Sequence, residues 1–266
     1  MRQAWATAFV TGSGSGIGLR LAELLAQRGT RLALFDLRFS DEARSRFTRL
    51  APGTVFHQVD VRDANALEAA VRASVAEVGR PQLAINCAGV QRNRTFLELD
   101  AADFDFVVDV NLRGTRNFAA AVLPHLAAGA NLVLLASLAG LVGNYGYAAY
   151  NASKFGVVGL ASALRIECRP QGIDVTVVCP PEVVTPMVLE ERRTASPVSM
   201  ATKDFAGVVE LDELCNDILR GATCGEWMIV TGFKARLTRF LARTAPGLMN
   251  RITDRMVADA LRRHGG

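Results

Sequence analysis

The residues best suited to chemistry are a serine, a tyrosine and a lysine in the stretch 137–154. Tyr150 and Lys154 are four positions apart, so in a helix both side chains lie on one face. A free phenol has a pKa of about 10, and a nearby ammonium group favours the phenolate. Ser137 precedes this pair and adds a hydroxyl. The pair predicts a proton donor that works near neutral pH, and the alternative is a tyrosine packed by chance beside a surface lysine.

A glycine-rich turn lies near the start of the sequence. The apolar run 5–10 leads into the turn 11–18, TGSGSGIG, and leucines at helical spacing follow it. Gly12, Gly16 and Gly18 have the spacing GxxxGxG. Glycine permits positive φ and lets the backbone approach a pyrophosphate at a helix N-terminus. The pattern predicts a strand, a dinucleotide-binding turn and a helix, with a merely flexible turn as the alternative.

An acidic residue near the end of the second predicted strand, 31–37, bears on the choice of cofactor. Asp36 follows Gly18 at the distance where a carboxylate would hold a ribose 2′-hydroxyl. The same carboxylate would repel a 2′-phosphate, and the glycine turn contains no Lys or Arg to offset it. NAD(H) is therefore expected. NADP(H) is the alternative, since Arg38 and Arg44 lie nearby in the sequence.

Apolar segments alternate with helical patterns along the rest of the chain. Further strands are expected at 55–61, 81–89, 131–137, 174–180 and 227–232, and helices at 64–79 and 103–127. The stretch 38–53 is poorly periodic, and 181–205 has the length of a lid or binding loop. The alternation predicts one α/β domain, with a parallel sheet and helices on both faces. Active groups in such sheets gather at the carboxyl ends of the strands, where Ser137 lies.

Composition indicates a single globular protein in a reducing compartment. Half of the 266 residues are hydrophobic, which is enough to bury a sizeable core. The five cysteines have no CxxC or Cys/His ligand spacing, so buried free thiols and no metal site are expected. No apolar run is long enough for a spanning helix, and the first residues lead directly into the glycine turn without a signal peptide. A cytoplasmic location is expected.

Five features occur in the order typical of the short-chain dehydrogenase/reductase family. They are the turn TGSGSGIG, Asp36, NCAG at 86–89, Asn111, and Ser137 with YNASK at 150–154. Over residues 1–232 the sequence resembles this family, which implies a Rossmann-type, doubly wound, seven-stranded parallel sheet in a single domain. It also implies NAD(P)-dependent interconversion of a secondary alcohol and a ketone. A non-catalytic nucleotide-sensing or scaffold protein on the same fold is the alternative from another class.

The resemblance also implies a role for each residue that matches the family's motifs. Tyr150 would exchange a proton with the substrate oxygen, Lys154 would lower the pKa of Tyr150 and bind the nicotinamide ribose, and Ser137 would orient the oxygen. Asn111 would bend its helix and hold a water that links Lys154 to solvent. Asp60 would lie against the adenine, and the alternative for it is a helix N-cap. The cofactor-binding residues implied, besides Tyr150 and Lys154, are Gly12, Ser15, Gly16, Ile17, Gly18, Asp36, Asp60, Val61, Asn86, Ala88, Gly89, Pro180, Val183 and Thr185.

The C-terminal segment, 233–266, is a basic and amphipathic extension. From Lys234 onward there are eight Lys/Arg and two Asp, a balance of +6, so the remainder carries −2 of the total of +4. Apolar residues recur there at helical spacing, at Leu237, Phe240 and Leu241 and again at Leu248, Ile252 and Met256. Three interpretations remain: a helical pair that covers the substrate cleft or a subunit partner, a peripheral membrane contact, and a docked helix with an ordinary charged face. A nucleic-acid partner is not expected, because the sequence contains no binding motif.

The long loop favours a lipophilic substrate. Its apolar residues are Val183, Val184, Met187, Val188 and Leu189. Together with the extension, the loop sequence PPEVVTP is similar to that of family members that reduce long-chain ketones such as 3-ketosphinganine or other lipid carbonyls. The family resemblance further implies a homodimer or homotetramer that associates through the helices around 103–127 and 150–168.

Overall fold

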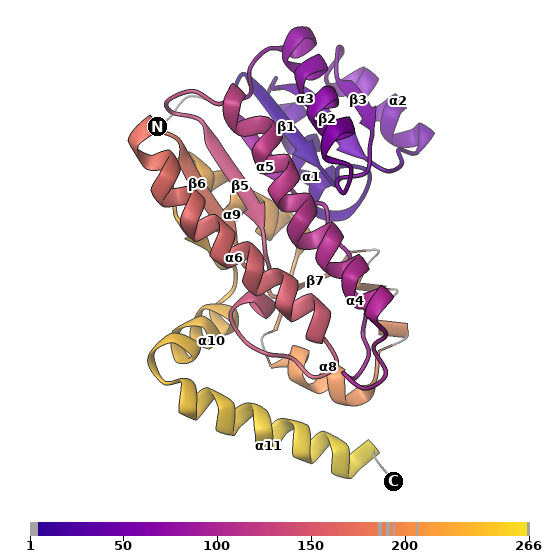
Figure 1. Cartoon of the computed structure of the whole chain (residues 1–266), viewed down its shortest axis with the longest axis vertical. Helices are drawn as coiled ribbons and strands as arrows, with labels where there is room; N and C mark the ends of the chain where they lie inside the picture. Colours follow the sequence, from indigo (N-terminus) through magenta and orange to yellow (C-terminus); the bar gives the residue numbers. More distant parts are fainter. Residues whose placement is uncertain (1–4, 186–187, 190–191, 194, 206, 265–266) are drawn as a thin grey trace.

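Seven parallel strands form one twisted sheet in the structure of the protein, a computed structural model that describes residues 5–185, 188–189, 192–193, 195–205 and 207–264 (Figure 1). The strand order is β3-β2-β1-β4-β5-β6-β9. The strands are β1 (Thr7–Thr11), β2 (Arg31–Asp36), β3 (Val55–Gln58), β4 (Leu83–Asn86), β5 (Asn131–Leu135), β6 (Asp174–Val178) and β9 (Met228–Ile229). All seven overlap the predicted ranges, so the prediction of a Rossmann-type, doubly wound, seven-stranded parallel sheet is confirmed.

Helices cover both faces of this sheet. Those packed directly on it are α1 (Gly16–Gln27), α2 (Asp41–Leu50), α3 (Ala64–Val78), α5 (Gly114–Val122), α6 (Ala148–Cys168) and α9 (Leu211–Thr223). Strand side chains alternate between the faces, so Phe9 packs with Phe118 of α5, while Val10 packs with Leu21 of α1 and Leu214 of α9. Two apolar layers therefore hold the carboxyl edge of the sheet in place.

The poorly periodic stretch 38–53 contains a helix, α2. Ala43 and Phe47 are its buried residues, so its apolar pattern is sparse. Its N-terminus is specified by capping, because Ser40 Oγ accepts a hydrogen bond of 3.1 Å from Ala43 N, and Asp41 and Glu42 lie in the first turn. The capping residues identify this helix where periodicity does not.

The helix predicted at 103–127 is present and contains a local distortion. α4 (Ala101–Val108) leads into a π turn at Asp109–Arg113, and α5 is followed by a 3-10 turn at Leu123–His125. Asn111, which is fully buried, lies in the middle of the π turn. The prediction of a long helix is confirmed, since the backbone stays helical throughout, and the distortion expected at Asn111 takes the form of this π turn.

The segments beyond β6 cover one end of the molecule. The loop predicted at 181–205 contains β7 (Glu182–Val183) and α8 (Pro197–Asp204), and β7 pairs with β8 (Val208–Val209); Met187 lies outside the described residues. The extension forms two helices, α10 (Phe233–Thr244) and α11 (Pro246–His264), and α11 packs against α8 (Figure 1). The extension is therefore a pair of helices, and all three interpretations of its role remain compatible with this structure. Among the described helices, none combines the length and apolar character needed to cross a membrane.

Candidate active site

A cavity of about 360 Å³ lies along the carboxyl edge of the sheet. It extends from Gly12 in the glycine turn, past the end of β5, to Met256 on α11. The strand order reverses between β1 and β4, and ligands of open α/β sheets bind at such a reversal. Of the residues predicted for the site, all line this cavity except Asn86 and Asn111, which are fully buried.

The glycine turn is built so that its backbone packs closely. Gly12 has φ of 62°, and a Cβ there would lie 2.6 Å from Ala88 N. A Cβ on Gly18 would lie 2.1 Å from the carbonyl oxygen of Gly12. Residues 15–18 line the cavity at the start of α1, and the first turn of that helix contains no acidic residue within the described structure. Its amide groups can therefore receive an anion such as a pyrophosphate.

Backbone amides fix the carboxylate of Asp36 at the cavity wall. Its Oδ2 accepts a hydrogen bond of 2.8 Å from Gly14 N, and its Oδ1 accepts one of 3.1 Å from Arg38 N. The side chain of Arg44 lies elsewhere, with its guanidinium 5.0 Å from the centre of the Phe56 ring. The position where a ribose hydroxyl would bind is therefore negatively charged and rigid.

Asp60 and Val61 also line the cavity, after the end of β3. Asp60 forms an ion pair with Arg62, at 2.6 Å between Oδ2 and Nη2, and this hydrogen bond lowers the pKa of the Asp60 carboxyl. The N-cap of α3 is Asp63, whose Oδ1 accepts a 3.0 Å hydrogen bond from Ala66 N. The alternative role of Asp60 as the helix N-cap is therefore wrong.

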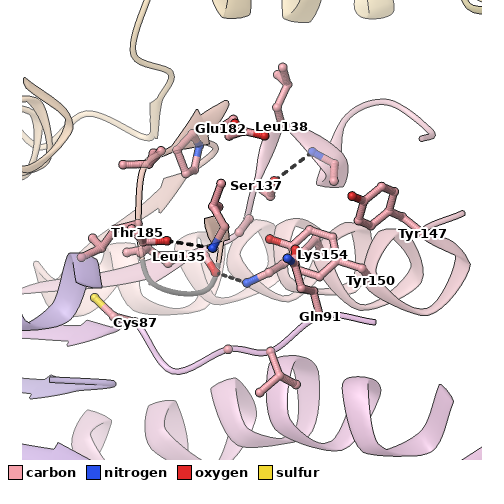
Figure 2. A pocket seen from close by; sticks show the side chains of 18 of the residues that line it. Cys87, Gln91, Leu135, Ser137, Leu138, Tyr147, Tyr150, Lys154, Glu182 and Thr185 are labelled. Atoms are coloured by element: carbon pink, nitrogen blue, oxygen red, sulfur yellow. Dashed lines mark hydrogen bonds between the residues drawn. The ribbon is translucent and has the colours of Figure 1, made fainter. Parts of the chain in front are cut away.

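Ser137, Tyr150 and Lys154 meet where β5 ends and α6 begins (Figure 2). Lys154 is only 5% exposed, its Nζ donates a hydrogen bond of 2.9 Å to the carbonyl oxygen of Leu135, and it lies 5.6 Å from the centre of the Tyr150 ring. Burial lowers the pKa of Lys154 to about 8, because desolvation disfavours the ammonium form. Ser137 Oγ accepts a hydrogen bond of 3.1 Å from Ala139 N. The Ser137 hydrogen is thereby directed away from Ala139.

Asn111 supports this group from behind the cavity. Its Oδ1 accepts a hydrogen bond of 2.8 Å from Val90 N, and its Nδ2 donates to Val90 O at 2.9 Å and to Ser153 Oγ at 3.0 Å. Ser153 precedes Lys154 in α6, and Val90 follows Gly89, where a Cβ would lie 3.5 Å from Lys154 Nζ. Asn111 therefore ties the loop after β4 to the turn of α6 that carries the lysine.

Asn86 corrects an expectation, since it does not line the cavity. Its Oδ1 accepts a hydrogen bond of 2.6 Å from Thr11 Oγ1, and its Nδ2 donates one of 2.8 Å to Thr115 Oγ1. The side chain thus joins β4 to the end of β1 and to α5. In this place Asn86 shapes the floor of the cavity through its neighbours.

The cavity lining also contains residues that were not predicted, among them Gln91, Tyr147, Glu182 and Lys203. The Glu182 side chain is 1% exposed and forms ion pairs with Arg192 and, at 3.0 Å, with Lys203 Nζ. Lys203 Nζ also lies 5.7 Å from the centre of the Tyr147 ring. A glutamate inside the apolar run PPEVVTP was the available signal, because a carboxylate is seldom buried without a cation.

Gln91 combines a place in the cavity lining with an unusual polar atom. Its Nε2 is buried, and among the residues that the structure describes it has no hydrogen-bond partner. Leaving such a donor unpaired costs about 1–3 kcal/mol, so buried donors are almost always satisfied.

Comparison with known proteins agrees with this fold. Residues 6–196 match the family model for short chain dehydrogenases. The chain therefore belongs to the short-chain dehydrogenase family, and it is an oxidoreductase by that membership.

Individual relatives extend the comparison. The chain is 35% identical over 199 residues to oxidoreductase UcpA of Salmonella typhimurium, covering 72% of this chain and 74% of that protein. It is 35% identical over 238 residues to 3-dehydrosphinganine reductase TSC10A of Arabidopsis thaliana, covering 86% of this chain and 72% of that protein. Among solved structures, a short chain dehydrogenase/reductase from Burkholderia phymatum in complex with NAD superposes with a TM-score of 0.78 at 25% identity, covering 91% of this chain and 94% of that one.

Proposed function

We propose that the protein is an NAD(H)-dependent oxidoreductase that interconverts a secondary alcohol and a ketone on a lipophilic molecule. The observation that carries the proposal is the placement of Ser137, Tyr150 and Lys154 in one cavity with the glycine turn and the fixed carboxylate of Asp36. The relatives support it, since one is named a 3-dehydrosphinganine reductase and a structural neighbour was solved with NAD.

The catalytic steps follow from the positions of three side chains. In the direction of reduction, the Tyr150 hydroxyl gives a proton to the substrate oxygen as a general acid. The buried ammonium of Lys154, held by the carbonyl of Leu135, favours the phenolate that remains. Ser137 Oγ accepts a hydrogen bond from Ala139 N, so the hydroxyl hydrogen of Ser137 is available to bond the substrate oxygen. A bound nicotinamide supplies the hydride.

The remaining residues bind and orient. Gly12, Gly16 and Gly18 would hold the pyrophosphate at the start of α1, because their backbone approaches closely and the helix end favours an anion. Asp36 would accept hydrogen bonds from the ribose hydroxyls and repel a 2′-phosphate, which favours NAD(H) over NADP(H). Asn111 is a positioning residue in this scheme, acting through Val90 and Ser153.

A panel of hydrophobic ketones tests the proposal, with oxidation of NADH followed by absorbance. We expect turnover with NADH and a lower kcat/KM with NADPH. Asp36→Ala should reduce the ratio of kcat/KM with NADH to kcat/KM with NADPH, because it removes the carboxylate that would repel the 2′-phosphate. A wild-type preference for NADPH would contradict the role of Asp36. Binding of NADH without turnover of any ketone or alcohol would favour a nucleotide-sensing protein on the same fold.

A further inference from the structure

A second cavity, of about 700 Å³, lies under α11 and has no part in the chemistry described so far. Its walls are the loop 141–145, the start of α6 and the inner side of α11. Most of the lining is apolar, including Leu141 and Phe155 on one wall and Val257, Ala258 and Leu261 on the other. We call this cavity the α11 groove.

The α11 groove adjoins the catalytic cavity. Val142, Gly143 and Asn144, in the loop after Ser137, line both. Met249 and Thr253 on α11 also line both. The two cavities therefore adjoin along these shared residues, the first of which, Val142, is five residues after Ser137.

The chemistry of the α11 groove suits an uncharged chain. The segment from Lys234 onward carries eight Lys/Arg, yet within the described residues no Lys or Arg lines the groove. Arg251 and Arg255 of α11 are instead exposed. Asp254 is the one charged residue in the lining. A groove of this kind would bury methylene groups and would repel an anionic ligand.

The positions of the two cavities indicate how a long substrate would be divided between them. The catalytic cavity runs from the glycine turn to α11 and would hold the dinucleotide and the reacting end of the substrate. A chain that continued beyond the reacting end would reach the residues that line both cavities, and the α11 groove lies beside them.

We propose that the two cavities form one channel, and that the substrate is a ketone or secondary alcohol carried near the end of a long, uncharged apolar chain. The chain passes between Val142 and Met249 into the α11 groove while the oxygen stays at Tyr150. α11 then sets the preferred chain length. This inference rests on the proposed function, since it assumes that the reacting oxygen binds at Tyr150.

Chain-length dependence provides the kinetic test, with a series of 2-alkanones of increasing length and saturating NADH. For wild type, kcat/KM should rise by up to about fourfold for each methylene that enters the α11 groove, at about 0.8 kcal/mol per buried methylene. Ala258→Trp should flatten this slope by filling the groove, and Ala258→Leu, which is less disruptive to folding, should reduce it. Arg255→Trp places the same side chain on an exposed position of α11 and should keep the wild-type slope.

Binding of a pyrene-labelled long-chain alcohol tests the channel without turnover. We expect wild type and Arg255→Trp to bind it, and Ala258→Trp to bind it at least about tenfold more weakly with an unchanged circular dichroism spectrum. Equal binding by all three, or none by wild type, overturns the channel. So does a shift of Ala258→Trp alone from dimer to monomer, since the groove would then be a contact between copies. Turnover of short alkanones with a flat slope keeps the proposed function and rejects the channel.

Discussion

At the scale of single residues, the buried Lys154 links catalysis to stability. Its pKa falls from about 10.5 to about 8 because desolvation disfavours the ammonium. Below pH 8 both the folded and the unfolded chain are protonated there, and the folded state bears the full cost of burial. Between pH 8 and 10.5 the unfolded chain binds a proton that the folded chain lacks, so the contribution of Lys154 to stability rises with pH.

Replacing the lysine should reveal this cost. We expect Lys154→Met to be more stable than wild type at pH 7 by up to about 3 kcal/mol, since one pKa unit corresponds to about 1.36 kcal/mol. The advantage should shrink as the pH rises from 8 and should be absent near pH 10.5. Denaturant unfolding of both proteins at each pH measures the difference, and the comparison cancels groups common to both. If the difference in free energy of unfolding between the two proteins did not change with pH, the lowered pKa of Lys154 would be contradicted.

The positions of the reactive residues were predictable because each depends on local geometry. Tyr150 and Lys154 share a face through helical spacing alone, and Ser137 follows a strand that could be recognised from its apolar run. Asn86 was not predictable in this way. Whether its side chain faces the cavity or the sheet is decided by Thr11 and Thr115, which are distant in the sequence.

At the scale of elements, the loop after β6 is held in place by a charge cluster formed by Glu182, Arg192 and Lys203. Glu182 of β7 pairs with Lys203 of α8 and with Arg192, although its own side chain is 1% exposed. The side chains of Lys203 and Arg192 are 15% and 42% exposed, so water can solvate both cations, and the pairs contribute less than fully buried ion pairs would. The cluster therefore holds α8 over the cavity.

Neutralising this carboxylate should loosen α8. We expect Glu182→Gln to destabilise the protein by about 1.5–3 kcal/mol, the range for hydrogen bonds to charged groups, and to speed amide hydrogen exchange in α8 more than in β5. Glu68→Gln is the control, since Glu68 pairs with Arg72 on the surface of α3 and such a pair contributes about 0.3–0.5 kcal/mol. If the two substitutions changed the stability and the hydrogen exchange of α8 equally, the role of Glu182 in holding α8 in place would be contradicted.

Elements with strong periodicity or several turns were predictable, and shorter or irregular ones were not. β7 and β8 have two residues each, too few to show an alternating pattern. The π turn around Asn111 interrupts a segment whose apolar spacing is helical on both sides. A distortion there was expected only from the family resemblance, because the hydrogen bonds of Asn111 to Val90 and Ser153 join residues that no local pattern relates.

At the scale of the whole molecule, α10 presents an apolar stripe next to positive charge. Phe233 and Phe240 are 80% and 61% exposed, and Leu237 lies between them on the same face. The helix also carries Lys234 and Arg243, and no acidic residue lies in it. Such a helix suits contact with an anionic membrane surface, which attracts each Lys or Arg by about 1 kcal/mol.

Vesicle sedimentation checks this contact. We expect the protein to pellet with phosphatidylserine-containing vesicles at low salt, to release as salt rises, and to stay in solution with purely zwitterionic vesicles. Joint replacement of Phe233 and Phe240 by Ser should abolish pelleting. The control is Phe96→Ser, which replaces a phenylalanine that is 71% exposed and lies outside α10, and it should leave pelleting unchanged. Failure to pellet under every condition would contradict a membrane role for α10. A homodimer or homotetramer formed through the helices around 103–127 and 150–168 stays a separate prediction.

The most direct test of the central claim is the activity of Tyr150→Phe. The claim is that the Tyr150 hydroxyl, beside the ammonium of Lys154, exchanges the proton with the substrate oxygen. With a ketone that wild type reduces, kcat should fall by about 10²–10⁴-fold, the usual contribution of a general acid, while the Kd for NADH stays nearly unchanged. Retention of near wild-type kcat by Tyr150→Phe would contradict the account.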